Sequence, residues 1–530
     1  MGSKFAPYIV LLLLLSACAA TDDRRTSTLT LIHLNDTYRM SPVEDGAAGG
    51  FGRVVTVIRS LQSEGRDVHI LHAGDFLYPS LESQLWNGLQ MVDALNFVAE
   101  LAPIYLVAGN HDFEHDNPEH LVNAIRASRF HWLGDNYRLE TGEADVDSAL
   151  QSGFSFRHDD KVIGVFSLTM HPDEGDNDRP YVRVDRDYVG IAEKVISDFE
   201  NRGADLIVGL THLDFATDLE IAKLKAAHPR FVFVVGGHEH EPRQSQANST
   251  AAAVMKGASN ARVIWQIDVE FDPGGRARIN GEALDMDRSV VEDPEFLVLQ
   301  NKWRNELLEK FPFLEARIGA AAIPLDATEA TIRNEETSWG NFITDQMRLA
   351  FGEPAADLAF LNSGTLRIDD YIADEVNFED VGRTFGFSSF LRYMTMTGAE
   401  FRQMMEAGYR GTGPSKGYFP QVSGFRVCID RGRPEGSRIV SLQVPGAAGW
   451  REIDADREYT VVVPDFLYGG GDGYVMPKNR TASRPGSELK YLVLDAILRA
   501  QREGRAIGEP VDPANPRFVE LDSERTVCFD

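Results

Sequence analysis

Short apolar runs in the first half of the chain are each followed closely by side chains that can bind metal ions. Asp36 follows Leu29–Leu34, Asp75 follows Val68–Leu71, Asn110 and His111 follow Ile104–Val107, His212 follows Leu206–Leu210, and His238 and His240 follow Phe231–Val235. Carboxylate, amide and imidazole groups suit Zn, Mn, Fe or Co ions. One carboxylate can bridge two such ions about 3.5–4 Å apart, and the pair lowers the pKa of a bound water. The pattern therefore predicts a site for two divalent metal ions.

The set of motifs is more specific than any one of them. A lone Gly-Asp or Gly-His pair is more often a turn, because glycine favours tight backbone geometry. His33 and His72 lie beside the motifs, and we expect them to be buried core residues rather than ligands. His115 and His120 are expected on the surface.

The elements that must position these residues alternate along the chain. The apolar runs, with Val162–Leu168 as a sixth, are rich in Val, Ile, Leu and Phe, as buried strands are. Segments with helical spacing lie between them, at 54–61 and 191–199. This alternation predicts an α/β layered fold, in which ligands bind beyond the carboxyl ends of the strands. A connecting helix is expected to begin at Asp293-Pro294, because aspartate caps helices and proline suits the first helical position.

The second half of the chain carries residues suited to a nucleotide. Asn362 and Arg367 follow an apolar run, and arginine offers planar donors that match phosphate. Phe419 lies in a turn-like aromatic segment, and Phe466 precedes a glycine-rich segment that contains Asp472. Two phenylalanines on separate loops could sandwich a planar base, at about 1–3 kcal/mol per base. A carboxylate could accept hydrogen bonds from ribose. The alternative is that both phenylalanines belong to the core.

The first-half motifs have a specific resemblance. Asn-Asp (35–36), Gly-Asp (74–75), Gly-Asn-His-Asp (109–112), Thr-His (211–212) and Gly-His-x-His (237–240) resemble those of the calcineurin-like metallophosphoesterases. With the second half, the mature chain resembles the bacterial 5′-nucleotidase and UDP-sugar hydrolase family. The resemblance implies a four-layer β-sandwich flanked by helices, plus a second α/β (α+β) domain. It also implies hydrolysis of phosphate esters of nucleotides by a water that two metal ions activate, where the domains meet.

The resemblance further implies roles for individual residues. Asp75 would bridge the ions, Asn110, His212 and His238 would complete the shell of one ion, and Asp36 and His240 would bind the other. His111 would donate to the phosphoryl oxygens and Glu114 would orient His111. In the second domain, Phe419 and Phe466 would hold the base, Asp472 the ribose, and Arg367 and Asn362 the phosphate, with Arg392 and Arg410 as further phosphate candidates.

The first motif departs from the family, which usually has histidine where this chain has Tyr38. Tyrosine is a poorer ligand than histidine for most divalent metals, although it binds ferric iron. Three interpretations are open: Tyr38 binds a harder or oxidised metal, a water replaces the missing imidazole, or this metal position is weak. The identity of the metals (Mn, Zn, Co or Fe) is open with it.

The resemblance divides the chain into five parts. We expect a lipoprotein signal peptide at 1–17, a tether at 18–27, a calcineurin-like phosphoesterase domain at 28–290, a helical linker and hinge at 291–325, and a 5′-nucleotidase C-terminal domain at 326–530. A UDP-sugar hydrolase or a cyclic nucleotide phosphodiesterase would have the same fold. A surface lipoprotein that binds without metal or catalysis is a further alternative, but it would not need Asp75, Asn110, His111, His212, His238 and His240. An exported metal-binding protein without catalysis is another, but it gives His111 and Arg367 no role.

The charge of the chain constrains its partners. The formal net charge is −28 and the isoelectric point is about 4.9, which argues against binding to nucleic acid. The same field repels phosphate esters at long range. A phosphate site in this chain therefore needs local cations, from metal ions or arginine side chains.

The N-terminus predicts export and a lipid anchor. Lys4 precedes an apolar run that ends at Leu15 and is too short to span a bilayer comfortably. Leu-Ser-Ala-Cys at 15–18 resembles the bacterial lipoprotein box, in which the signal is cleaved before the cysteine and the cysteine is acylated. An ordinary cleavage site nearby is the alternative. A lipid on Cys18 would place the protein in the cell envelope, on a membrane, and Ala19 favours the outer membrane.

Export also bears on the two other cysteines, Cys428 and Cys528. Disulfides form and persist in oxidising compartments outside the cytosol. We therefore expect these two residues to form a disulfide that closes the C-terminal domain. Two buried free thiols are the alternative.

Overall fold

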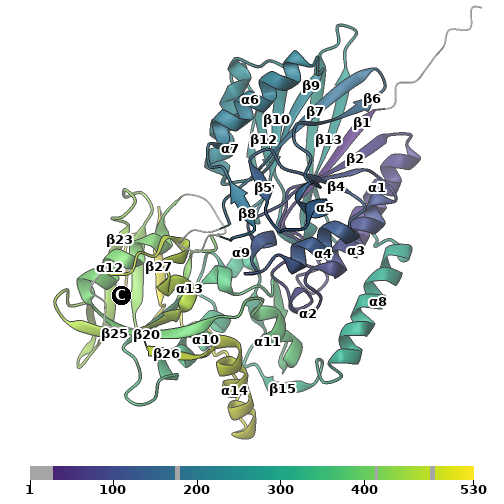
Figure 1. Cartoon of the computed structure of the whole chain (residues 1–530). Coiled ribbons are helices and arrows are strands. Elements are labelled where there is room, and N and C mark those ends of the chain that lie inside the picture. Colours follow the sequence, from purple (N-terminus) through teal and green to yellow (C-terminus); the bar gives the residue numbers. More distant parts are fainter. Residues whose placement is uncertain (1–27, 173–178, 412–415, 478–483, 524, 530) are drawn as a thin grey trace, which may run out of the picture.

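The computed structural model describes residues 28–172, 179–411, 416–477, 484–523 and 525–529. It contains two domains joined by helix α8 (Pro294–Lys310), which runs along the right-hand edge of Figure 1. Cys18 and the rest of the expected signal and tether lie outside the described residues. In the part of the chain that is described, no helix combines the length and the hydropathy that a membrane crossing needs.

The first domain is built on two six-stranded sheets. The first sheet contains, in spatial order, β14 (Ala277–Asp285), β13 (Val263–Phe271), β1 (Leu29–Leu34), β2 (Asp67–His72), β3 (Ile104–Val107) and β4 (His131–Leu133). The second contains β11 (Arg243–Ser245), β12 (Ala253–Lys256), β10 (Phe231–Gly236), β9 (Leu206–His212), β7 (Lys161–Thr169) and β6 (Phe154–His158). The six predicted strands all form, each within a residue or two of its expected bounds.

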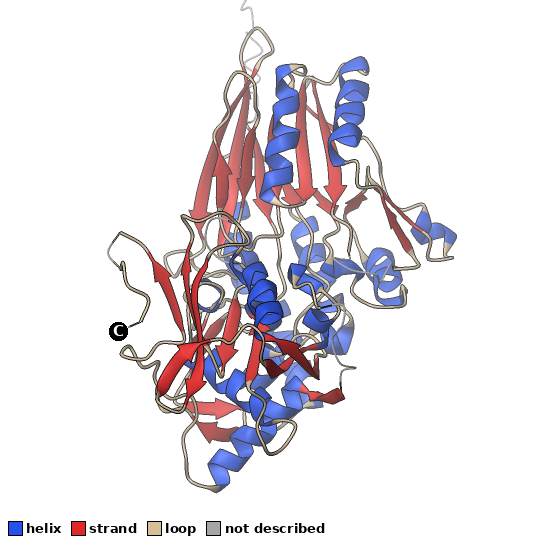
Figure 2. Ribbon diagram, turned by 90° about the vertical axis from the view of Figure 1, so that its left-hand side faces the viewer, coloured by secondary structure: helices blue, strands red, loops and turns tan. Residues whose placement is uncertain are grey.

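The strand directions bring the predicted ligands to one edge. β1 to β4 run parallel, and so do β7, β9, β10 and β12. Their arrowheads point the same way, toward the second domain, in Figure 2. The carboxyl ends of both sets of strands therefore lie together, where an α/β sheet binds its ligands.

The two sheets pack face to face, and helices cover their outer faces. In β9, Leu206, Val208 and Leu210 face the first sheet, whereas Ile207 faces α6 (Tyr188–Asn201) and α7 (Phe215–Ala222), because side chains alternate along a strand. Helices α1 (Phe51–Ser63), α3 (Leu89–Ala99) and α4 (Glu119–Ala127) contribute their apolar faces to the core of the first sheet. The resulting helix–sheet–sheet–helix arrangement is the predicted four-layer sandwich.

The connecting helix begins where the sequence predicted. The Asp293 side chain accepts hydrogen bonds from the backbone N–H groups of Glu295 and Phe296, each at 3.0 Å. The Phe296 ring then packs against Phe51 of α1 and Phe97 of α3, at centroid distances of 6.0 and 5.4 Å. Helix α8 is thus held against the first domain before the chain enters the second.

The second domain is also α/β. Its five-stranded sheet has the order β21 (Pro420–Ser423), β17 (Leu358–Asn362), β25 (Glu458–Pro464), β20 (Phe390–Thr397) and β26 (Arg484–Glu488). A four-stranded sheet contains β24 (Gly449–Glu452), β23 (Ile439–Gly446), β22 (Arg426–Asp430) and β27 (Phe518–Leu521). Helices α10 (Ser338–Leu349) and α14 (Leu489–Arg502) cover one face of the larger sheet, and α12 (Gly398–Met405) packs on the other.

Shorter elements complete both domains. They are α2 (Ser83–Trp86), β5 (Tyr137–Leu139), α5 (Ala144–Asp147) and β8 (Val182–Val184) in the first domain, and β15 (Arg317–Ala320), β16 (Leu325–Ala327), α9 (Glu329–Ile332), β18 (Asp370–Ile372), β19 (Glu375–Asn377), α11 (Phe378–Thr384) and α13 (Asp465–Tyr468) in the second. Single 3-10 turns occur at His111–Phe113, Lys223–Ala226, Ser259–Ala261, Ser363–Thr365, Glu406–Tyr409 and Gly471–Gly473.

A disulfide closes the second domain. Cys428 of β22 is bonded to Cys528, which follows β27, and their Cα atoms are 5.5 Å apart. The bond ties the C-terminal segment to the four-stranded sheet, as the sequence led us to expect.

Candidate metal centre and substrate cavity

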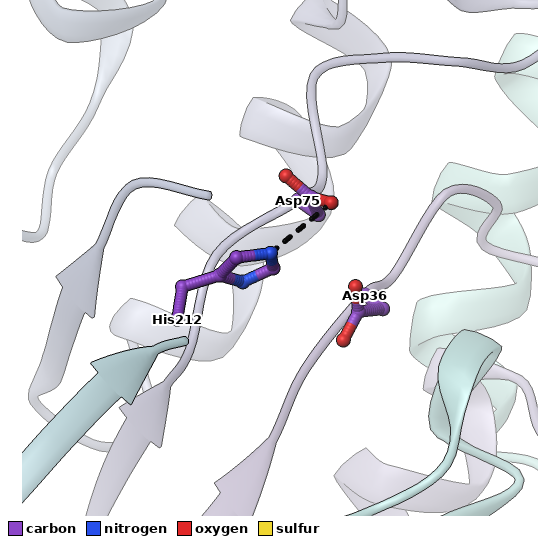
Figure 3. Close-up of side chains that lie close together, drawn as sticks. All are labelled: Asp36, Asp75 and His212. Carbon is purple, nitrogen blue, oxygen red and sulfur yellow. Dashed lines mark ion pairs between the residues drawn. The ribbon is translucent and has the colours of Figure 1, made fainter. Parts of the chain in front are cut away.

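Three of the predicted metal ligands converge from separate strand ends. Asp36 follows β1, Asp75 follows β2, and His212 ends β9. One ligand atom of each lies within 4.8 Å of the others, and all three residues are buried. Figure 3 shows their side chains facing a common space, with the 3.3 Å ion pair between Asp75 and His212 drawn as a dashed line.

Tyr38 lies inside a first group of ligands. Its hydroxyl oxygen is 3.3 Å from Oδ1 of Asp36, 3.2 Å from Oδ2 of Asp75 and 3.0 Å from Nε2 of His240. Only 6% of Tyr38 is exposed. We call Asp36, Tyr38, Asp75 and His240 the first ligand group.

A second ligand group consists of Asp75, Asn110, His212 and His238. Nε2 of His212 is 3.1 Å from Oδ1 of Asn110, and the rings of His212 and His238 are 5.6 Å apart. Asp75 belongs to both groups, which is the position that a bridging carboxylate requires.

The two groups fit divalent metal ions. Asp36 and Asp75 are 0% and 1% exposed, and two carboxylates buried this close together are unfavourable unless a cation compensates them. Burial alone would lower the pKa of His212, but Asp75 outweighs it and raises that pKa to about 10, because the buried carboxylate favours a positive charge beside it. A divalent ion bound here would supply such a charge.

The backbone is strained at four of the predicted metal ligands. The φ angles are 53° at Asp36, 57° at Asp75, 88° at His238 and 66° at His240, in a region that residues other than glycine rarely adopt. Such a conformation costs on the order of 1–3 kcal/mol and persists only when the surroundings fix it. All four residues belong to the two ligand groups, so this backbone strain lies where side chains must point toward a common centre.

Two buried charges that the sequence pattern did not single out fix these loops. The Asp112 carboxylate accepts hydrogen bonds from four backbone N–H groups, including that of Asp75 at 2.9 Å. Lys256, which is 1% exposed, donates to the carbonyl oxygens of Leu213 and Gly237 and to the Glu239 carboxylate. Lys256 thus joins the loop after His212 to the loop that carries His238 and His240. Asp112 at least lies within the Gly-Asn-His-Asp motif, whereas nothing in the sequence marks Lys256.

His111 connects the two domains. Its Nδ1 is 3.0 Å from Oε2 of Glu114, and its Nε2 is 3.1 Å from Nη2 of Arg367 in the second domain. The guanidinium of Arg367 also lies over the Phe387 ring, 4.9 Å from its centroid. Its Nε and Nη1 are buried and have no hydrogen-bond partner among the described residues. Unpaired guanidinium donors of this kind suit an anion with several oxygens.

A cavity of about 840 Å³ joins the metal ligands to the second domain. On the first-domain side it is lined by Asp75, Asn110, His111, Glu114, His238 and His240, and on the second-domain side by Asn362, Arg367, Tyr418, Phe466 and Asp472. Its volume suits a small organic ligand. Arg179, Arg333, Arg410 and Lys416 also line it, so the cavity offers local cations for an anionic ligand in a chain of net charge −28.

The structure corrects the role expected for Phe419. Phe419 is 1% exposed and packs in the core, 4.9 Å from the Phe518 ring. The neighbouring Tyr418 lines the cavity instead, with the Arg410 guanidinium 4.0 Å from its ring centroid. Phe466 lines the cavity as expected and is 49% exposed. The aromatic side chains of these two segments that line the cavity are therefore Tyr418 and Phe466, and Tyr78 and Phe387 line it as well.

Asp472 is held in place by Asn362, whose Nδ2 donates to Oδ2 of Asp472 at 2.7 Å. Gly471 allows this arrangement, because a Cβ atom at that position would overlap the Phe466 ring. Of the two further phosphate candidates, Arg410 lines the cavity and Arg392 does not.

Three other histidines, His33, His72 and His120, are buried in the first domain. His33 is fully buried, with its ring nitrogens 3.1 and 3.0 Å from the carbonyl oxygens of Leu71 and Gly236. His72 is also fully buried. The expectation that His120 lies on the surface is wrong: it is 3% exposed, and its Nε2 is 2.8 Å from the carbonyl oxygen of Asp112.

Comparison with known protein families assigns different family models to the two domains. Residues 29–242 match the family model of the calcineurin-like phosphoesterases. The fold and the ligand groups thus define a hydrolase acting on phosphoester bonds. Residues 317–479 match the model of the 5′-nucleotidase C-terminal domain, and the chain belongs to the calcineurin-like phosphoesterases that carry this second domain.

Individual relatives resemble the chain over most of its length. The structure of a 5′-nucleotidase precursor from Thermus thermophilus has a TM-score of 0.79 at 24% identity and covers 94% of this chain and all of that one. The 5′-nucleotidase of Bos taurus is 23% identical over 514 residues, which are 89% of this chain and 88% of the relative. The trifunctional nucleotide phosphoesterase protein YfkN of Bacillus subtilis (strain 168) is 24% identical over 524 residues, and this chain spans 34% of its length.

Proposed function

We propose that the protein is a metal-dependent 5′-nucleotidase, which hydrolyses the phosphate ester of a nucleotide in the cavity between its domains. One observation carries the proposal. A single cavity joins the metal ligand groups, the unpaired guanidinium donors of Arg367 and an aromatic pair, Tyr418 and Phe466. These three features match the phosphoryl group, its negative charge and the base of a nucleotide.

The residues of the first domain, together with Arg367 of the second, would carry out the reaction at phosphorus. Two divalent ions, one in each ligand group, would offset the charge of the phosphoryl group and lower the pKa of an attacking water. Arg367 would bind the phosphoryl oxygens that do not react. Glu114 lies 3.0 Å from Nδ1 of His111 and would orient the ring, so that Nε2 faces the phosphoryl group and donates to it.

The residues of the second domain would hold the nucleoside. Tyr418 and Phe466 would stack on the base, which tolerates different bases because every base has a π-face. Asp472, aimed by Asn362, would accept hydrogen bonds from the ribose hydroxyls.

Product analysis with metal-stripped protein tests this function. The protein is restored separately with Mn, Zn, Co or Fe and incubated with AMP, cyclic AMP, UDP-glucose and bis-p-nitrophenyl phosphate, beside an Asp75→Asn variant. We expect metal-dependent phosphate release from AMP that the variant lacks. Cleavage of cyclic AMP alone would instead indicate a cyclic nucleotide phosphodiesterase of the same fold, and cleavage of UDP-glucose alone would indicate a UDP-sugar hydrolase. No cleavage with any metal would favour a binding protein.

We further propose that the Tyr38 oxygen is a direct ligand in the first ligand group, because it lies within 3.3 Å of three other members. A ferric ion bound to a phenolate absorbs visible light. Protein loaded with Fe³⁺ should therefore be coloured, and Tyr38→Phe should abolish the band. A band that survives in Tyr38→Phe would contradict direct ligation.

For the N-terminus, we propose that a lipid on Cys18 anchors the protein to a membrane of the cell envelope. The support is the Leu-Ser-Ala-Cys sequence at 15–18. Mass spectrometry of the mature N-terminus should find an acylated cysteine as its first residue, and Cys18→Ser should release the protein from membranes. An unmodified N-terminus at another residue would refute the anchor.

We also propose domain boundaries at 28–290, 291–325 and 326–530. The first is supported by β14, which completes the first sheet at Asp285. Limited proteolysis should cut preferentially within 311–316, the turn segment between α8 and β15, and an earlier cut inside either domain would move the boundary.

A further inference from the structure

His240, a member of the first ligand group, is held by the other domain. Its Nδ1 lies 2.9 Å from both carboxylate oxygens of Glu329, which is 89 residues away in α9 of the second domain. His240 and Glu329 are 3% and 2% exposed, so water does not compete for this contact. A ligand from the first domain therefore has its outer hydrogen-bond partner in the second.

The contact determines which nitrogen of His240 can bind a cation. An ionised carboxylate only accepts hydrogen bonds, so the proton of the neutral imidazole resides on Nδ1. Nε2 then keeps its lone pair, and it lies 3.4 Å from Asp36 and 3.0 Å from the Tyr38 hydroxyl, inside the first ligand group. A carboxylate in this position fixes both the tautomer and the orientation of a metal-binding histidine.

The charge of Glu329 is itself fixed. Nη2 of Arg333 donates to it at 2.5 Å, the Ser259 hydroxyl donates at 2.8 Å, and Arg262 lies 3.5 Å away. Two guanidinium groups and a hydroxyl thus face this carboxylate, which are the surroundings that an ionised carboxylate needs when buried.

A second contact reaches the same ligand group. Nδ2 of Asn260 donates to the Asp369 carboxylate of the second domain at 3.0 Å. The backbone N–H of Asn260 donates to the carbonyl oxygen of Asp36 at 2.9 Å, and its side-chain oxygen accepts from the backbone N–H of Tyr38 at 3.2 Å. Asn260 thus connects the second domain to two more members of the first ligand group.

The two histidines of the second ligand group have their outer partners in the first domain. Nδ1 of His212 lies 2.6 Å from the carbonyl oxygen of Ala73, within its own domain. His238 lies 3.7 Å from Asp214, again in the first domain. The two groups differ, therefore, in which domain holds their outer partners.

We propose that the second domain controls cation binding at the first ligand group, with Glu329 as the positioning residue for His240. A cation in this group and the contact between the domains then stabilise each other, because each strengthens the arrangement that the other needs. The second ligand group binds its cation independently of the second domain. The proposal rests on the proposed function for its metal ions, but it concerns their binding and not the substrate.

Calorimetric titration of metal-stripped protein with Mn²⁺ tests the proposal. The Glu329→Gln variant keeps the size of the side chain and removes its charge. We expect one of two Mn²⁺ sites to weaken by about 10–100-fold, which is the usual effect of losing a partner of a metal ligand, while the other is unchanged. Glu82→Gln is the matched control, because Glu82 also forms an ion pair across the domains, with Arg383 at 2.8 Å, but contacts no ligand. It should change Mn²⁺ affinity by less than about 3-fold on the same reasoning.

A second measurement needs no variant at Glu329. Hydrogen exchange of residues 329–333 in the unaltered protein should slow when Mn²⁺ is added, and Ser259→Ala should reduce this protection. The proposal is overturned if Glu329→Gln binds two Mn²⁺ ions like the unaltered protein, if it weakens both sites equally or no more than Glu82→Gln does, or if no Mn²⁺ binds. A protein that binds Mn²⁺ as expected but cleaves no nucleotide would refute the proposed function alone.

Discussion

The two walls of the cavity are built on different principles. In the first domain, the residues around the metal positions follow buried strands, and Asp36 and Asp75 are almost completely inaccessible. In the second domain, the residues that face the cavity come from varied elements: Asn362 ends β17, Phe466 lies in the four-residue helix α13 and is 49% exposed, and Tyr418 lies in a turn. Chemistry at phosphorus requires ligands held to a fraction of an ångström, whereas stacking on a base tolerates small displacements.

Backbone strain follows the same division. Four of the predicted metal ligands have positive φ angles, and the Asp112 carboxylate and the Lys256 ammonium hold the loops of Asp75 and of His238 and His240. Among the cavity residues of the second domain singled out above, only Asp472 has such an angle, 52°. The first domain is therefore where a small substitution should be most damaging, and the second is where affinity should be adjustable.

The bridging position gives the most severe test of this comparison. Asp75→Asn keeps the shape of the side chain but removes the charge that both ligand groups share. We expect kcat/KM for AMP to fall by at least about 10³-fold, because both cations lose a ligand. Steady-state kinetics and metal content measured on the same sample check this. If the variant retains two ions and a tenth of the activity, Asp75 is not a bridge.

Arg367 lies between the two walls and should have the next largest effect. Arg367→Gln removes the unpaired donors and the charge beside His111, and we expect kcat/KM to fall by about 10²-fold, as when one charge-stabilising donor is removed. Arg392→Gln is the matched control. Its side chain does not line the cavity, so its kinetics should stay within about 2-fold of the unaltered protein. Equal losses in both variants would remove Arg367 from the site.

Substitutions on the second-domain side of the cavity should change KM rather than kcat. Tyr418→Ala and Phe466→Ala should each raise KM for AMP by roughly 5- to 100-fold, since stacking on a base is worth about 1–3 kcal/mol. Phe419→Leu should leave KM unchanged and lower the free energy of unfolding by about 1–2 kcal/mol, because it changes a packed core. Kinetics and urea unfolding of the three variants separate the two outcomes. A raised KM in Phe419→Leu alone would restore the role first expected for it.

The same comparison explains what could be predicted from the sequence. The strand ends and the ligands after them are local patterns, so β1, β3 and Asp36, Asp75 and His212 could all be located without a structure. The choice between Tyr418 and Phe419 could not be made, because adjacent side chains in an irregular turn follow no period. Both residues are aromatic, and only packing against Phe518 decides which one is buried.

Contacts between distant segments could not be predicted either. Glu329 reaches His240 only because two domains meet, and no spacing in the chain records that approach. Lys256 is similar: a single lysine at the end of a strand is usually exposed, but here two loops of the first domain close over it. In both cases the missing information is the tertiary arrangement rather than the local conformation.

The disulfide should have the smallest effect on catalysis and a clear effect on stability. Neither Cys428 nor Cys528 lines the cavity, so Cys428→Ser should leave kcat/KM within about 2-fold of the unaltered protein. The free energy of unfolding of the second domain should fall by about 2–5 kcal/mol, because the bond restrains a loop of 100 residues in the unfolded chain. Cys528→Ser and the reduced unaltered protein should show the same unfolding midpoint, since all three lack the same bond. A higher KM in these samples would mean that the second-domain side of the cavity depends on the C-terminal segment. The disulfide would then support substrate binding as well as stability.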